Sequence, residues 1–108
     1  MAVQNIFDEI KASAQRKILY LPHAIRQMSR PDRMISPMDV REVIENGEII
    51  EDYPADPRGH SCLMFLHKNK EYPIHVVCSP KEDYLAIITA YIPSRDEWDA
   101  NFTKREKT

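Results

Sequence analysis

Apolar positions recur every three or four residues in the first part of the chain and every second residue farther on. Helical spacing predicts a helix over residues 4–15, and a second helix that begins at Pro22 and ends near the sequence RPD. Between them, the sequence KILYL has the character of a short strand. The best-marked helix follows Ser36, which can cap it, with Pro37 at its first position and Gly47 after its end.

From residue 48 onward, short turns separate four segments with strand-like patterning. These segments are EIIEDY, SCLMFLH, PIHVVCS and YLAIITAYI. Because parallel crossovers need a dozen or more residues, such short links favour an antiparallel meander. Near the end, Ser94 and Glu97 have capping-box spacing, and Trp98 and Phe102 lie four residues apart, which predicts a short C-terminal helix. The fold class is therefore α+β, with N-terminal helices packed on one three- to four-stranded antiparallel sheet.

Length and composition indicate one domain. We divide the 108 residues into an N-terminal helix (1–16), a single α+β domain (17–102) and a charged tail (103–108) that we expect to fray. The first helix would suit either docking on the domain or dimerisation. No apolar run reaches the ~18 residues of a membrane span, and the first residues show no export signal, so we expect a cytoplasmic location. A net charge of −2 disfavours coating of nucleic acid but permits local phosphate binding.

The stretch LPHAIRQMSR separates polar from apolar residues around a short helix. At about 100° per residue, one arc holds His23, Arg26, Gln27 and Arg30. The opposing arc, predicted to face the core, holds Ala24, Ile25 and Met28. The polar arc is either an ordinary solvated surface or the start of a site.

Alternation along the later strands places further polar groups together. In PIHVVCS, one face holds His75, Val77 and Ser79. In YLAIITAYI, one face holds Leu85, Ile87, Thr89 and Tyr91. If the strands are neighbours in suitable register, His75, Thr89 and Tyr91 line one patch. On spacing alone a structural role for His75 is the slightly favoured interpretation, and His23 could equally be an exposed surface residue.

The remaining titratable groups give weaker signals. His60 and His67 are expected to be solvated, and Cys62 and Cys78 to be buried reduced thiols that lie close together if their strands form a hairpin. The chain has no HxxxH, HxH or CxxC spacing, no G-x-S-x-G and no glycine-rich phosphate loop. We therefore expect neither a metal nor another cofactor.

Two histidines, clustered arginines and strand hydroxyls suit metal-free cleavage of RNA. One group must take the proton of a 2′-hydroxyl, a second must protonate the leaving oxygen, and cations must stabilise the charged transition state. Histidine can serve either proton role near neutral pH. Arginine offers planar, permanently charged donors to phosphate oxygens.

The motifs HA, ISPMDVREVIENGEIIEDYP, SCLMFL, PIHVV, IITAYIP and EW occur in this order between about Leu19 and Asp99. Together they resemble the small bacterial domain of unknown function catalogued as DUF family 4258. That family is grouped by resemblance with the RelE, barnase, EndoU and colicin-type ribonuclease fold, in which several members are toxins of toxin–antitoxin pairs. The resemblance implies helices packed on an antiparallel sheet, in agreement with the patterning.

The resemblance also assigns residues. It matches His23 to the histidine of the HA motif, His75 to that of HVV, and Thr89 and Tyr91 to polar strand positions. The family pattern has an arginine one turn beyond the HA histidine. This chain has Gln27 there, flanked by Arg26 and Arg30, and Arg33 matches a second arginine of the motif. The departure leaves a degenerate, non-cleaving member as an alternative.

The sequence thus predicts a metal-independent endoribonuclease, the toxin of a toxin–antitoxin pair. Its catalytic residues would be His23 and His75, as general base and acid in either order, with Tyr91 and Thr89 beside them. Phosphate would be held by Arg26, Arg30 and Arg33. The expected partners are RNA, including ribosome-bound messenger, and a cognate antitoxin protein, with no membrane partner. The alternative is a non-catalytic module that keeps the fold and binds a protein or RNA.

Overall fold

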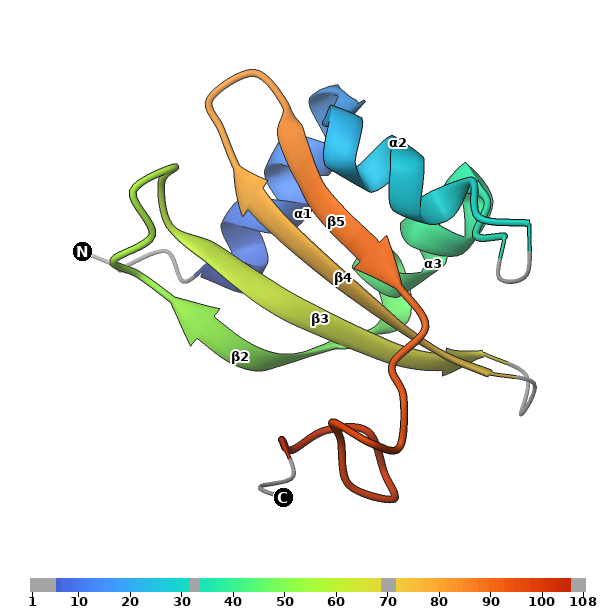
Figure 1. Ribbon diagram of the computed structural model, residues 1–108. Helices are drawn as coiled ribbons and strands as arrows, with labels where there is room; N and C mark the ends of the chain where they lie inside the picture. Colours follow the sequence, from blue (N-terminus) through green and yellow to red (C-terminus); the bar gives the residue numbers. More distant parts are fainter. Residues whose placement is uncertain (1–5, 32–33, 69–71, 106–108) are drawn as a thin grey trace.

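In the described part of the chain, five strands form one sheet in the order β1-β5-β4-β3-β2, with three helices packed around it. The computed structural model describes residues 6–31, 34–68 and 72–105. In chain order the elements are α1 (Ile6–Arg16), β1 (Ile18–Tyr20), α2 (Pro22–Met28), α3 (Pro37–Asn46), β2 (Glu48–Tyr53), β3 (Ser61–Lys68), β4 (Tyr72–Pro80) and β5 (Leu85–Tyr91). Figure 1 shows α1 and α3 behind the sheet and α2 running along β5. The α+β class is confirmed.

The sheet has one strand more than the patterning predicted. Strands β2 to β5 form the expected antiparallel meander. The additional strand is β1, which lies within the KILYL segment and pairs in parallel with β5. A parallel pair needs a long connection, and most of the domain lies between these two strands. The expectation of an antiparallel sheet considered only successive strands, so it could not include this pairing.

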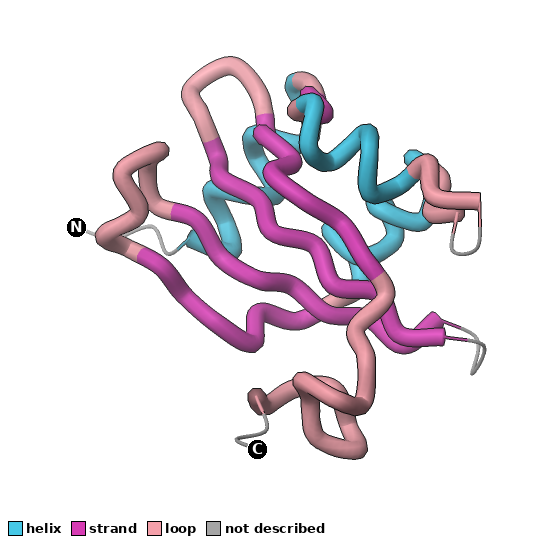
Figure 2. The backbone as a smooth tube through the Cα atoms, in the orientation of Figure 1, coloured by secondary structure: helices cyan, strands magenta, loops and turns pink. Residues whose placement is uncertain are grey.

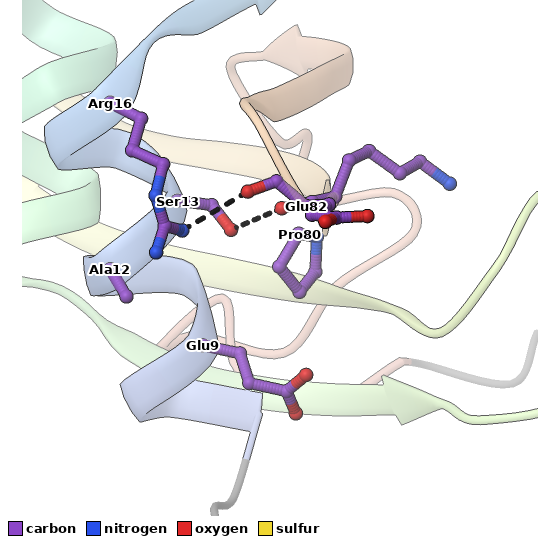
Figure 3. A pocket seen from close by; sticks show the side chains of 7 residues that line it. Glu9, Ala12, Ser13, Arg16, Pro80 and Glu82 are labelled. Atoms are coloured by element: carbon purple, nitrogen blue, oxygen red, sulfur yellow. Dashed lines mark hydrogen bonds between the residues drawn. The ribbon is translucent and has the colours of Figure 1, made fainter.

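Helix α1 docks on the sheet. Ile10 is fully buried in the core, and Lys11 donates a hydrogen bond to the carbonyl of Glu45 at the end of α3. Figure 3 shows the contact with the turn between β4 and β5, where Ser13 Oγ donates to a backbone carbonyl at 2.7 Å and Arg16 Nη1 to another at 3.1 Å. A hollow of about 300 Å³ lies beside this contact. Ser13 and Arg16, which line this hollow, form the hydrogen bonds that hold α1 in place. The hollow therefore results from the docking of α1 on the sheet.

Helix α3 begins and ends as predicted. Ser36 Oγ accepts a hydrogen bond from the Asp39 N–H at 3.1 Å, and the Asp39 carboxylate accepts one from the Ser36 N–H at 2.9 Å. This is a complete capping box, with proline at the first helical position. Gly47 ends the helix with a φ of −83°, outside the left-handed region. A Cβ there would lie 2.5 Å from the Val43 carbonyl oxygen and 2.7 Å from that of Phe65, so close backbone approach requires glycine.

A bulge changes which residues of β5 share a face. We expected Leu85, Ile87, Thr89 and Tyr91 to lie on one face. The pairing with β4 shifts between Val77 and Cys78, which leaves Ile88 as an extra residue. Beyond such a bulge the alternation reverses, so Thr89 points away from the helices although Ile87 points toward them. The expected single face was therefore wrong, but the bulge brings Tyr91 opposite the histidine of β4.

The segment after β5 crosses the sheet face that carries no helices. Figure 2 shows it as loop, and its Trp98 is 2% exposed. The predicted short C-terminal helix is wrong: residues 93–105 form turns and irregular structure. The Asp99 carboxylate accepts hydrogen bonds from the N–H groups of Asn101, Thr103 and Lys104, which competes with helical bonding. Phe102 then adopts a φ of +61°, which turns the chain back toward the sheet.

Two smaller expectations concern the thiols and the helices. Cys62 and Cys78 are directly paired across β3 and β4, buried and not disulfide-bonded, so their predicted proximity is confirmed. The hydrogen bond between the Cys78 and Cys62 thiols, together with burial, raises the pKa of Cys78. Within the described ranges, no helix has the length and apolar character needed to span a bilayer.

Candidate functional site

A polar cleft of about 410 Å³ opens between α2, the end of β5 and the C-terminal segment. Its lining residues are His23, Gln27, Arg30, Thr89, Tyr91, Ile92, Ser94, Glu97, Trp98 and Arg105. The structure thus brings His23, Arg30, Thr89 and Tyr91 together, as the sequence predicted. Each of three chain segments contributes at least one polar side chain, so the cleft exists only in the folded domain.

Helix α2 presents three different sides. Ala24 and Met28 are buried against the core, at 0% and 6% exposure. The residues facing the cleft are His23, Gln27 and Arg30. Ile25 lies on the third side and is 52% exposed, so its predicted place in the core is wrong. A helix that packs along the edge of a sheet buries a narrower stripe of side chains than a helix that lies across the middle of a sheet face. Ile25 falls outside the buried stripe of α2.

Of the two other predicted arginines, only Arg26 belongs to the residues that the structure describes. Arg26 is exposed on α2 and is not among the lining residues. Arg33 lies outside the described residues. Gln27, which stands where the family pattern has an arginine, does line the cleft. Among the predicted arginines that the structure describes, the one that faces the cleft is therefore Arg30, which lies just beyond the end of α2.

His75 lies behind the cleft, fully buried beneath Tyr91. Its Nε2 is 2.7 Å from the backbone carbonyl oxygen of Phe102, and its Nδ1 is 3.2 Å from the Tyr91 hydroxyl. A carbonyl can only accept, so Nε2 carries the proton and Nδ1 accepts from Tyr91. The hydrogen-bond partners thus fix both the tautomer of His75 and the direction of the tyrosine O–H.

The surroundings of His75 keep it neutral. Burial lowers the pKa of His75 to about 4, although the hydrogen bond to Phe102 acts in the opposite direction. Its ring packs edge-on against Trp98 at a centroid distance of 4.4 Å and against Phe65 at 5.7 Å. We expected a general acid or base at this position. Where the structure places it, His75 holds Tyr91 and the C-terminal segment and has no surface open to a substrate.

Tyr91 forms the floor of the cleft and remains protonated. Burial raises the pKa of Tyr91 to about 12, with the charge of Arg105 acting in the opposite direction. Because its proton is directed to His75, the phenolic oxygen presents its lone pairs elsewhere, as an acceptor. Thr89 lies beside it on the same strand and lines the same cleft.

Arg105 is a cleft residue that the sequence did not reveal. Its Nε lies 2.9 Å and its Nη2 3.2 Å from the two carboxylate oxygens of Glu51, and its guanidinium lies 4.7 Å from the ring centre of Trp98. Although burial opposes the shift, hydrogen bonds from Arg105 and Tyr53 lower the pKa of Glu51. The residue falls in the tail that we expected to fray. Its place is set by the path of the C-terminal segment, for which no local pattern exists.

Glu97 is the other missed residue. The sequence placed it in a helix cap, whereas the structure places it as an exposed carboxylate on the cleft wall. His23 and Glu97 are thus an imidazole and a carboxylate, both accessible, in one cleft. The other two histidines lie elsewhere: His60 contacts Asp52 at 2.5 Å, and His67 is exposed at the end of β3. Among the described residues, no group of three or more metal-ligating side chains occurs.

Comparison with known proteins gives one match. A family model described as "Domain of unknown function (DUF4258)" matches residues 20–92. The matched range begins at the last residue of β1 and includes α2, α3 and the meander of β2 to β5. No curated protein and no solved structure matches the chain significantly. The match includes His23, Arg30, Thr89 and Tyr91, and it ends before Glu97 and Arg105.

Proposed function

The chain belongs to the DUF4258 family, a domain of unknown function, and we propose that its cleft binds and cleaves RNA without a metal. The observation that carries this proposal is the meeting of His23, Arg30 and Arg105 in one polar cleft together with Glu97. Two guanidinium groups can hold a phosphate, and two accessible titratable groups can move protons. These are the parts that metal-free phosphodiester chemistry needs.

Each group has a role in the proposed reaction. The Glu97 carboxylate takes the proton of the ribose 2′-hydroxyl, whose oxygen then bonds to phosphorus. The bond from phosphorus to the 5′-oxygen breaks, and the leaving oxygen receives a proton from the His23 imidazolium. Arg30 and Arg105 stabilise the additional negative charge on the phosphate oxygens. The products carry a 2′,3′-cyclic phosphate and a 5′-hydroxyl group.

The buried histidine supports this reaction indirectly. By accepting the hydrogen bond that the Tyr91 hydroxyl donates, His75 leaves the phenolic oxygen free to accept a hydrogen bond from a ribose hydroxyl. Thr89 offers a second hydroxyl at the cleft floor. The RelE-like grouping, a toxin role in the cytoplasm, ribosome-bound messenger as substrate and restraint by a cognate antitoxin belong to the same proposal, and the family resemblance supports them.

A cleavage assay with purified protein in excess chelator tests the proposal. We expect His23→Ala and Glu97→Gln each to slow RNA cleavage by at least ~100-fold, because each removes a proton-transfer group. His67→Ala is the matched control, since it removes an exposed histidine outside the cleft and should cleave as the wild type does. Cyclic-phosphate ends that disappear in both cleft variants would support the roles. Cleavage that persists in both would contradict them.

Binding without cleavage is the second candidate, and the burial of His75 favours it. Of the two histidines expected to share proton transfer, only His23 reaches the cleft. In that case labelled RNA should bind with an affinity that falls as salt rises, while no cleavage occurs. Arg30→Ala should weaken this binding and reduce its salt dependence, whereas His23→Ala should change it little.

A further inference from the structure

A second hollow, apolar in character, lies on the other side of α2 from the polar cleft. It has a volume of about 380 Å³ and lies between α2, the end of β1 and the chain leading into α3. Its apolar lining consists of Tyr20, Ile25, Met28, Met34, Ile35 and Pro37. A hollow of this size can receive one or two aliphatic side chains.

The rim of the hollow exposes large apolar side chains. Ile25 is 52% and Met34 67% exposed, and both line the hollow. A single exposed apolar residue needs no explanation, but two that border the same apolar hollow form a patch that water solvates poorly. Methionine is flexible and adapts its shape to an incoming surface. The patch therefore has the character of an interaction surface.

Two arginines lie near the hollow, whereas the nearby Asp39 carboxylate is buried and hydrogen-bonded to the Ser36 N–H. None of the residues that line the hollow, all within the described part of the chain, is acidic. Arg26 lies exposed on α2 next to Ile25. Burial raises the pKa of Tyr20 while the charge of Arg41 lowers it, which places Arg41 within electrostatic reach of the hollow.

We propose that this hollow docks a segment of another protein that inserts aliphatic side chains and carries carboxylates on either side of them. The apolar lining selects the aliphatic anchors, and Arg26 and Arg41 select the acidic flanks. The occupant would contact α2 on the side away from His23 and Arg30. Docking and access to the polar cleft are therefore compatible, and the docking site does not depend on the proposed cleavage.

Selection from a displayed library of random twelve-residue peptides against the full chain tests the proposal. We expect the enriched peptides to combine aliphatic residues with Asp or Glu. Their affinities would then be measured by fluorescence anisotropy for the wild type, Met34→Glu and Met38→Glu. Both methionines are highly exposed, at 67% and 73%, but only Met34 lines the hollow, so Met38→Glu is the matched control. Circular dichroism would confirm that each variant is folded.

The expected result is an affinity at least ~10-fold lower for Met34→Glu and unchanged for Met38→Glu, because a carboxylate in the hollow repels the peptide and cannot be desolvated there. Reversal of charge in Arg26→Glu should weaken binding and reduce its salt dependence, whereas Arg95→Glu, outside the hollow, should not. Failure to enrich any peptide, enrichment without acidic residues, or equal binding to Met34→Glu would overturn the proposal. So would a wild-type dimer that Met34→Glu converts to a monomer, since the occupant would then be a second copy of the chain.

Discussion

The two faces of the sheet are covered in different ways. One face packs against α1 and α3, and the strand residues that point into it, among them Met64, Ile74 and Val76, are apolar and fully buried. The other face carries His75 and is covered by residues 92–105 at the end where His75 lies, and by the loop that contains Asp56 and His60 at the other end. The C-terminal segment is held by the indole of Trp98, a hydrogen bond from His75 to Phe102 and the ion pair of Arg105.

The difference shows which walls of the cleft are held in place by directional interactions and which are not. Apolar packing is non-directional, so the helix-covered face can be stabilised by many combinations of side chains. Hydrogen bonds require particular partners at particular positions, so the C-terminal segment has one well-defined path. The α2 wall of the cleft is held by the first kind of contact, and the wall that carries Glu97 and Arg105 by the second.

The largest expected effect follows from removing the Trp98 indole, which helps to cover the sheet face that carries His75, here called the polar face. Trp98→Ala deletes a side chain that is 2% exposed and packs against His75. We expect the free energy of unfolding, measured by urea denaturation with circular dichroism, to fall by ~3–5 kcal/mol. Because the burial that lowers the pKa of His75 would be lost, NMR titration should show that pKa rising from about 4 toward ~6.5.

Ile74→Ala is the matched control for this substitution. Ile74 precedes His75 in β4 but faces the helices and is fully buried. Its truncation should also cost ~2–5 kcal/mol while leaving the pKa of His75 low. If that pKa stayed near 4 in Trp98→Ala, the C-terminal segment would not be what buries the ring, and the contrast between the faces would fail.

Acid should weaken the polar face through His75. Its pKa is lowered to about 4 in the folded chain, against ~6.5 when unfolded, so the unfolded state binds the proton first as pH falls. The contribution of neutral His75 is therefore complete above the unfolded value and is lost as pH falls toward the folded one. We expect the free energy of unfolding to decrease by about 2 kcal/mol between pH 7 and pH 5.

His75→Gln keeps a polar side chain but cannot titrate, so urea denaturation of this variant should show little of the decrease. An equal decrease in wild type and variant would assign the pH dependence to other groups, such as the Glu51 carboxylate, whose charge acts on His75.

The same contrast explains what could be predicted from the sequence. The start of α3 depends on neighbours in the chain, Ser36, Pro37 and Asp39, and was predicted correctly. The polar side of α2 followed from helical periodicity, which located His23 and Arg30. The pairing of β1 with β5, the bulge at Ile88 and the path beyond Tyr91 depend on residues distant in sequence. Glu97 and Arg105 reach the cleft through that path, so no periodicity or spacing could have identified them.

A smaller effect is expected at the start of α3, on the helix-covered side. Ser36→Ala removes the hydroxyl that accepts from Asp39 N–H, and should lower the free energy of unfolding by ~1 kcal/mol in urea denaturation. Ser29→Ala is the matched control. Ser29 Oγ donates to the Ile25 carbonyl at the exposed end of α2, a contact that we expect to contribute less. Equal losses in the two variants would contradict the importance of the capping box for this face.

The smallest effect is expected for the ion pair between Arg105 and Glu51. The Arg105 side chain is 59% exposed, so water and salt screen the attraction, and a double-mutant cycle of Arg105→Gln and Glu51→Gln should give a coupling energy of ~0.2–1 kcal/mol. Urea denaturation at low and high salt measures it, and high salt should reduce it. The glutamine at position 105 keeps part of the stem over Trp98, so the cycle separates charge from packing. A coupling well above this range would mean that charge, rather than the buried indole, holds the C-terminal segment. The polar face would then loosen with salt, and the cleft wall that carries Glu97 would loosen with it.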